Sequence, residues 1–157
     1  PYIDKDRLGA VGASFGGYSV YWLAGNHKKR FRSFLSHCGV YNLESMYGTT
    51  EELFFVEFDM GAPYTQKTKY RSYAMFNPMR FAHFWDTPIM VIHNDLDFRV
   101  PISQGMEAFT IARRQGLKAR FLSFPDENHW VLKPQNSLFW YQTVRDWITT
   151  YAPPGAR

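Results

Sequence analysis

Three side chains that are far apart in the sequence have the types and the order needed for nucleophilic catalysis. Ser14 stands in the peptide GASFG, Asp97 in HNDLDFRVP and His129 in DENH. A histidine can take the proton of a serine hydroxyl and return it to the leaving group, while a carboxylate fixes the imidazole tautomer and stabilises the imidazolium. The three residues therefore predict acyl transfer to Ser14 and then to water.

The peptide around Ser14 is typical of a tight turn between a strand and a helix. In that position Gly-x-Ser-x-Gly lifts the serine hydroxyl clear of a sheet on strained backbone. We expect a Cβ at Gly12 or Gly16 to collide with the neighbouring strand or helix, and Gly17 to let the helix approach closely. The N–H of Phe15, at the helix N-terminus, is the predicted donor to the oxyanion.

Asp95, two residues before Asp97, is the alternative acid. A carboxylate that leads into the predicted helix start at Arg99 and Val100 fits better, which favours Asp97. The other histidines have no partner motif; they are His27, His37, His83 and His93. Neither His-x-x-x-His nor His-Glu-x-x-His occurs, and the single Cys38 predicts no disulfide and no cysteine-based metal site. We therefore expect no metal and no cofactor.

The elements that must position these residues alternate between strand and helix. Apolar and β-branched runs predict strands over 8–12, 31–38, 87–93 and 119–124. Apolar periodicity with Pro, Gly and Asn near the ends predicts helices over 18–24, 51–58, 78–84, 101–115 and 134–151, with Asn77 as an N-cap. The stretch 39–71 is the least regular. The alternation predicts an α/β fold, a mostly parallel sheet with helices on both faces.

Ser14, Asp97 and His129 each follow a predicted strand. In open parallel sheets the chemistry gathers at the carboxyl ends of the strands, so these three side chains are expected at one edge of the sheet. The order Ser, then Asp, then His along the chain is that of the α/β-hydrolase fold. Three placements therefore agree on one fold and one site.

Composition is consistent with one folded domain and excludes several other classes. The chain has 157 residues, of which 45% are apolar and 18% aromatic, ample for a buried core. The net charge of +4 is mild, and the basic cluster at 27–32 fits a solvated helix end better than a nucleic-acid surface. No apolar run is long enough to span a bilayer. We expect neither a nucleic acid nor a membrane as a partner.

Three spaced motifs resemble the catalytic domain of the prolyl oligopeptidase family of serine peptidases. They are GASFGGY at 12–18, Thr-Pro at 87–88 with HNDLDFRVP at 93–101, and Asn-His at 128–129, in the order of the family. The run at 126–137 resembles the bacterial dipeptidyl-peptidase 5 and acylaminoacyl-peptidase branch. Asn94 and Trp130 depart from the family pattern, which commonly has Gly at both places, and Trp130 also occurs in that branch.

The resemblance implies that residues 1–157 are a single, partial α/β-hydrolase domain, its C-terminal portion only. The family's N-terminal β-propeller and first hydrolase strands, which supply the second oxyanion donor, are then expected to lie outside the chain. A sheet without those strands exposes an apolar edge. We therefore expect the isolated chain to be weakly active, inactive or associated into a homo-oligomer through that edge. The resemblance also implies a periplasmic or secreted protein, with the cytoplasm left open.

The resemblance also indicates which residues meet the substrate. It assigns four residues to the pocket for the residue before the scissile bond: Val40, Leu43, Met46 and Val100. Core packing of an irregular insertion is the alternative role for them. Arg99 is expected to bind a substrate carbonyl or, alternatively, to start the following helix. An apolar pocket suits a small or hydrophobic residue, which predicts a dipeptidyl- or acylaminoacyl-peptidase acting on short peptides. The alternatives are an esterase of the same fold and a catalytically silent binding or scaffold domain.

Overall fold

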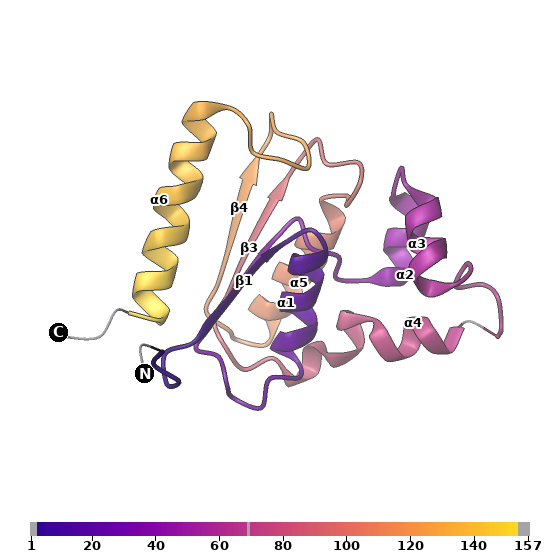
Figure 1. Cartoon of the computed structure of the whole chain (residues 1–157), viewed down its shortest axis with the longest axis horizontal. Helices are drawn as coiled ribbons and strands as arrows, with labels where there is room; N and C mark the ends of the chain where they lie inside the picture. The colour runs from indigo at the N-terminus through magenta and orange to yellow at the C-terminus, as the bar shows by residue number, and fades with distance from the viewer. Residues whose placement is uncertain (1–2, 69, 154–157) are drawn as a thin grey trace.

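The computed structural model describes residues 3–68 and 70–153, and within them the chain forms a four-stranded parallel sheet (Figure 1). The strands have the same order in space and in the chain: β1 (Gly9–Ala13), β2 (Ser33–His37), β3 (Ile89–Asn94) and β4 (Ala119–Phe124). Every residue of β3 is buried, because this strand lies inside the sheet and is covered on both faces. The predicted strands are confirmed, with ends displaced by two residues at most.

Helices cover both faces of the sheet. α1 (Phe15–Ala24) and α5 (Ser103–Arg114) lie on one face, and α6 (Pro134–Tyr151) lies on the other (Figure 1). α6 begins at Pro134, where a missing N–H costs no helical hydrogen bond, and α5 is followed by Gly116 at a φ of +79°, which ends the helix. Helices on both faces of a parallel sheet confirm the predicted α/β arrangement. None of the described helices has the length and apolarity to cross a membrane.

The sheet has two cores because side chains alternate across a strand. Phe34 and Ile89 face α1 and α5, whereas Leu35 and Met90 face α6, where they pack with Trp147. The indole N–H of Trp147 also donates to the Phe34 carbonyl at 3.1 Å. Neighbouring residues of one strand thus hold the two helical layers at the same time, which fixes the register of the sheet.

A helical insertion lies between β2 and β3. It consists of α2 (Leu43–Thr49), α3 (Leu53–Met60), α4 (Tyr70–Phe76) and the 3-10 helix η1 (Pro78–Phe84). Helices α2, α3 and α4 lie on the side of the molecule away from α6 (Figure 1). The sequence predicts the helix near α3 and the helix η1, but it misses α2 and α4, because the stretch 39–71 has no clear apolar period.

Two buried amide side chains, Gln104 of α5 and Asn77 between α4 and η1, accept hydrogen bonds from the backbone at the start of the insertion. Gln104 Oε1 accepts hydrogen bonds from the N–H groups of Tyr41 and Asn42, at 3.0 and 2.8 Å. Asn77 Oδ1 accepts from the Leu43 N–H at 3.2 Å. Asn77 therefore stands at the predicted N-cap position, but its side chain satisfies α2 rather than capping η1. A buried backbone N–H must find an acceptor, and here the amides provide it.

β1 and β4 are the edge strands of the described sheet, and they differ in charge. β1 consists of small and apolar residues, and Val11 is 52% exposed. β4 carries Arg120 and follows Lys118, and such charges discourage pairing with another chain. The outer edge of β1 has no such protection.

We expect the isolated 157-residue chain to self-associate through β1. The variant Val11→Lys should shift the chain toward the monomer, because a charge on an edge strand opposes strand pairing. Met106→Lys is the matched control, since Met106 is 51% exposed on α5, away from β1. Sedimentation velocity over a concentration series measures both. A wild-type chain that stays monomeric throughout would contradict the prediction, as would equal shifts in both variants.

Candidate active site

Ser14 occupies a sharp turn between β1 and α1. Its backbone has a φ of 57° and a ψ of −118°, a sparsely populated conformation that costs a non-glycine residue roughly 1–3 kcal/mol. The Ser14 N–H donates to the His37 carbonyl at 2.9 Å, and the Tyr18 N–H donates to the Ser14 carbonyl at 3.0 Å. β2 and α1 thus hold the turn from two sides. Phe15 is the first residue of α1, where N–H groups have no helical acceptor and can meet an oxyanion.

The glycines near Ser14 are required at two positions out of three. A Cβ at Gly12 would overlap the carbonyl of Gly16, and a Cβ at Gly17 would lie 2.6 Å from the Cα of Gly39. A Cβ at Gly16 meets nothing within 4 Å among the described residues, so the prediction of a collision there is wrong. The sequence motif does not show this, because the direction of each Cβ depends on how α1 crosses the sheet.

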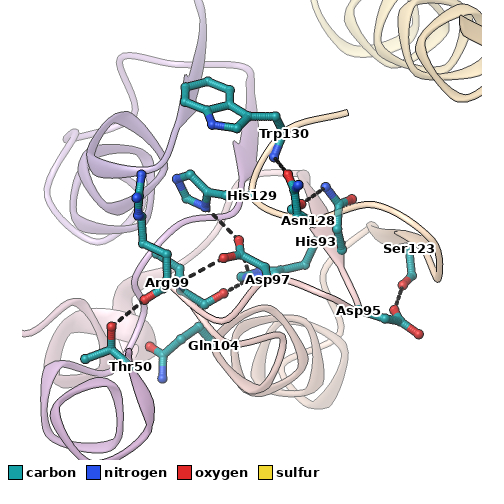
Figure 2. Close-up of polar contacts among 12 residues, drawn as sticks. Thr50, His93, Asp95, Asp97, Arg99, Gln104, Ser123, Asn128, His129 and Trp130 are labelled. Atoms are coloured by element: carbon teal, nitrogen blue, oxygen red, sulfur yellow. Dashed lines mark hydrogen bonds and ion pairs between the residues drawn. The ribbon is translucent and has the colours of Figure 1, made fainter. Parts of the chain in front are cut away.

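The buried Asp97 and the half-buried His129 form a hydrogen-bonded pair (Figure 2). His129 Nδ1 lies 2.7 Å from Asp97 Oδ2, and Asp97 also accepts from the Val100 N–H at 2.9 Å. Burial by itself raises the pKa of Asp97, but the hydrogen bonds from His129 and Val100 outweigh it and hold the pKa below its ordinary value. An ionised carboxylate keeps the imidazole proton on Nδ1, which leaves Nε2 free to act as a base.

Asp95, the alternative acid, has a different partner. It is exposed, and its carboxylate accepts a hydrogen bond from the Ser123 hydroxyl of β4 (Figure 2). Asp97, and not Asp95, is therefore the carboxylate in contact with His129.

Cys38, His93 and Asp97 form the group of described side chains that comes nearest to a metal site, since a ligand atom of each lies within 4.8 Å of the others. The prediction from spacing alone did not include this cluster. However, His93 Nε2 donates to the Val100 carbonyl at 2.7 Å, and Asp97 already binds His129. Burial also lowers the pKa of His93 and raises that of the Cys38 thiol, so both are held uncharged. His93 and Asp97 thus already have hydrogen-bond partners within the protein, and these bonds hold the loop that follows Asp97.

Ser14, Asp97 and His129 all lie beyond the carboxyl ends of their strands, on one edge of the sheet, as predicted. Within the described part of the chain, no hydrogen bond joins the Ser14 hydroxyl to His129. The structure therefore pairs the acid with the base and places the nucleophile on the same edge. The catalytic roles of the three residues stay a prediction.

A cavity of 410 Å³ opens beside Ser14. All five residues predicted to bind substrate line it together: Val40, Leu43, Met46, Arg99 and Val100. Their role as substrate contacts stays a prediction, but the fold gathers them at one place next to Ser14. The sequence misses the wall that α3 and α4 contribute, which includes Phe55, Val56, Met60 and Phe76. The available signal was the run LFFVEF, which is too apolar for a helix exposed to water.

The loop after Asp97 is fastened to the insertion. The Thr50 hydroxyl donates to the Arg99 carbonyl at 2.7 Å (Figure 2). The Glu51 N–H donates to the Phe98 carbonyl at 3.0 Å. The Arg99 guanidinium donates to the Glu52 carboxylate at 2.7 Å. Since α5 begins at residue 103, Arg99 does not start that helix but bridges the acid loop to the rim of the cavity.

A parallel sheet between two helical layers, a strained serine turn after β1 and a buried acid–histidine pair after β3 and β4 together define an α/β-hydrolase. The solved structure of the Pyrococcus horikoshii acylaminoacyl peptidase has the same fold, with a TM-score of 0.87 at 18% identity over 98% of this chain and 25% of that one. The chain belongs to the prolyl oligopeptidase family, whose model matches residues 1–154. The family resemblance seen in the motifs is thereby confirmed.

Curated relatives add detail to that assignment. Dipeptidyl-peptidase 5 of Porphyromonas gingivalis is 51% identical over 151 residues, which cover 94% of this chain and 22% of the relative. Dipeptidyl-peptidase 5 of Schizosaccharomyces pombe is 41% identical over 152 residues, which cover 96% of this chain and 22% of the relative. The chain thus spans 22% of the length of the curated relatives it matches.

Gly17→Ala is expected to destabilise the chain by about 1–3 kcal/mol, because the added methyl group would push α1 away from Gly39. Gly16→Ala is the control in the same helical turn, because its methyl group meets none of residues 3–68 and 70–153 within 4 Å. The better helix propensity of Ala is expected to leave the free energy of unfolding unchanged or to raise it by about 1 kcal/mol. Urea unfolding followed by circular dichroism measures both. Equal midpoints for the two variants would contradict the close approach of α1.

Proposed function

We propose that this chain is the C-terminal part of the catalytic domain of a serine peptidase, which cleaves short peptides through an acyl-enzyme on Ser14. The observation that carries the proposal is the hydrogen bond between the buried Asp97 and the half-buried His129, at the sheet edge where the strained turn of Ser14 stands. Membership of the prolyl oligopeptidase family supports the same chemistry. Dipeptidyl-peptidase 5 is the name of the curated relatives described above.

In the proposed mechanism, His129 Nε2 removes the proton of Ser14 while the hydroxyl attacks the substrate carbonyl. Asp97 stays ionised, accepts from the Nδ1–H of His129 and stabilises the imidazolium. The Phe15 N–H donates to the oxyanion. His129 then protonates the leaving amine. It next deprotonates a water molecule, which releases the acyl group from Ser14.

We assign the rest of the catalytic apparatus to a part of the protein that precedes this chain. Two observations support this assignment: the chain covers 22% of the length of its curated relatives, and β1 has an uncharged outer edge. That part would hold the first strands of the hydrolase sheet, the second oxyanion donor and a β-propeller that restricts access to short peptides.

The proposed substrates carry a small or hydrophobic residue before the cut. The cavity beside Ser14 is walled by apolar side chains such as Leu43 and Met46. Such a pocket selects side chains by size, and each methylene group changes the selectivity by about 10- to 200-fold. Arg99, held by Glu52 at the rim, presents a cation that can donate to a substrate carbonyl. These features support release of dipeptides or acylated amino acids.

A fluorophosphonate probe tests the nucleophile. We expect the full-length protein to be labelled and Ser14→Ala to lose both the label and, by roughly 10⁴- to 10⁶-fold, the hydrolysis of a dipeptidyl chromogenic substrate. Ser19→Ala is the matched control, because the Ser19 hydroxyl donates only to the carbonyl of its own helix at 3.0 Å. Labelling that survives in Ser14→Ala would refute the proposal. Hydrolysis of esters without hydrolysis of peptides would favour an esterase instead.

Met46→Ala is expected to change the preferred residue before the cut, because it enlarges the cavity beside Ser14. The ratio of kcat/KM for a dipeptidyl substrate ending in Phe to that for one ending in Ala should rise about 10-fold or more. Met106→Ala is the control of the same residue type, placed on α5 outside this cavity. An unchanged ratio in Met46→Ala, in a protein with an unchanged melting temperature, would contradict the assignment of the pocket.

A further inference from the structure

Asn94 is a buried polar residue in contact with both loops that carry the acid and the base. It is the last residue of β3, and it is 0% exposed. Its backbone carbonyl accepts from the Asp97 N–H at 3.3 Å. Its side-chain Nδ2 donates to the Asn128 carbonyl at 2.6 Å. One residue therefore connects the loop of Asp97 with the loop of His129.

The bond to Asn128 acts directly on the backbone of His129. The Asn128 carbonyl belongs to the peptide group that joins Asn128 to His129, and that group is planar. Fixing the direction of this carbonyl therefore fixes the plane from which His129 leaves the loop. On the other side, the Trp130 N–H donates to Asn128 Oδ1 at 2.9 Å (Figure 2). His129 thus stands between two peptide groups whose orientations are both held.

The orientation of the Asn94 amide follows from its partner. A carbonyl oxygen accepts hydrogen bonds only, so the NH₂ group of Asn94 must face Asn128. The other end, Oδ1, is buried and has no hydrogen-bond partner among the described residues. Burying an unsatisfied acceptor costs about 1–3 kcal/mol. A side chain present for packing alone would bring that cost without a benefit, whereas the bond to Asn128 gives the amide a specific task.

We propose that Asn94 is a positioning residue of the catalytic site, which holds His129 at hydrogen-bond distance from Asp97 by binding the Asn128 carbonyl. This proposal rests on the proposed function for its catalytic consequence. Asn94 acts through the placement of His129, because its side chain binds the backbone of the His129 loop. The family motif commonly has Gly at this position, and Gly has no side chain to make the bond. The hydrogen bond that places His129 in this chain therefore depends on Asn94.

The test compares wild type with Asn94→Leu in the full-length protein. Leu has nearly the same shape as Asn but cannot donate, so the Asn128 carbonyl loses its partner. We expect kcat to fall about 10- to 100-fold, since small displacements of a catalytic group have effects of this size, while KM stays within about twofold. The rate of labelling of Ser14 by the fluorophosphonate probe should fall by the same factor as kcat. Asn94→Gly, a second variant without the donor, should behave alike.

Ser123→Ala is the matched control. It also removes a hydrogen bond between β4 and the loop after β3, but that bond ends on Asp95 and not on Asp97 or His129. We expect it to keep kcat and KM. Melting temperatures of all variants show which of them are folded at the temperature of the assay. Equal losses of kcat in Ser123→Ala and Asn94→Leu, or an unchanged kcat in Asn94→Leu, would overturn the proposal.

A readout that does not need turnover separates this proposal from the proposed function. The proton in the hydrogen bond between His129 and Asp97 gives a downfield NMR resonance, which should shift or broaden in Asn94→Leu and stay in Ser123→Ala. An unaltered resonance in Asn94→Leu would overturn the positioning role even in an active enzyme. A wild-type protein that shows the resonance but is not labelled at Ser14 would refute the proposed function and not the placement of His129.

Discussion

The parallel register of the four strands is the constraint on which the site depends. Ala13 pairs with His37, His37 with Ile92, and Asn94 with Phe124. Because strands in this register end together, the turns that follow β1, β3 and β4 start from one edge of the sheet. A slip of one residue would exchange the two faces of a strand and so the two cores. Burial of both faces of the sheet therefore also determines that the three side chains proposed for catalysis lie at one edge of the sheet.

The second constraint is that the buried carboxylate of Asp97 needs hydrogen-bond donors. Asp97 is 2% exposed, and an isolated charge there would be strongly unfavourable. Hydrogen bonds from His129 and from the Val100 N–H compensate the charge of Asp97. The Val100 carbonyl in turn accepts a hydrogen bond from His93. Arg99, the nearest cation in the sequence, is paired with Glu52 instead. The group closest to the Asp97 carboxylate is thus the imidazole of His129, whose Nδ1 lies 2.7 Å from Oδ2, so one hydrogen bond both compensates the buried carboxylate and orients the ring.

The insertion illustrates where prediction from the sequence reaches its limit. The strands and the long helices α5 and α6 have clear periods or apolar runs, and they agree with the structure within two residues at most positions. α2 and α4 have no such period. Side chains of other segments hold them: Gln104 accepts from the Asn42 N–H before α2, and the Tyr18 hydroxyl donates to the Phe76 carbonyl of α4. The cavity wall that α3 supplies was missed because it, too, depends on contacts between distant segments. Its apolar side chains were visible in the sequence, but the cavity that they face is made by the fold.

The sequence by itself determined the fold class, the three residues proposed for catalysis and the family, since residue types, chain order and strand periods are local properties. Only the tertiary structure decided which carboxylate meets His129, which glycines are required near Ser14 and which residue ties the loops of acid and base together. Asp95 and Asp97 are two residues apart, as are many pairs in loops. The direction of each side chain depends on contacts with β4 and with the loop of His129, segments about 30 residues further along the chain. Distances across such gaps are set by packing and not by spacing along the sequence.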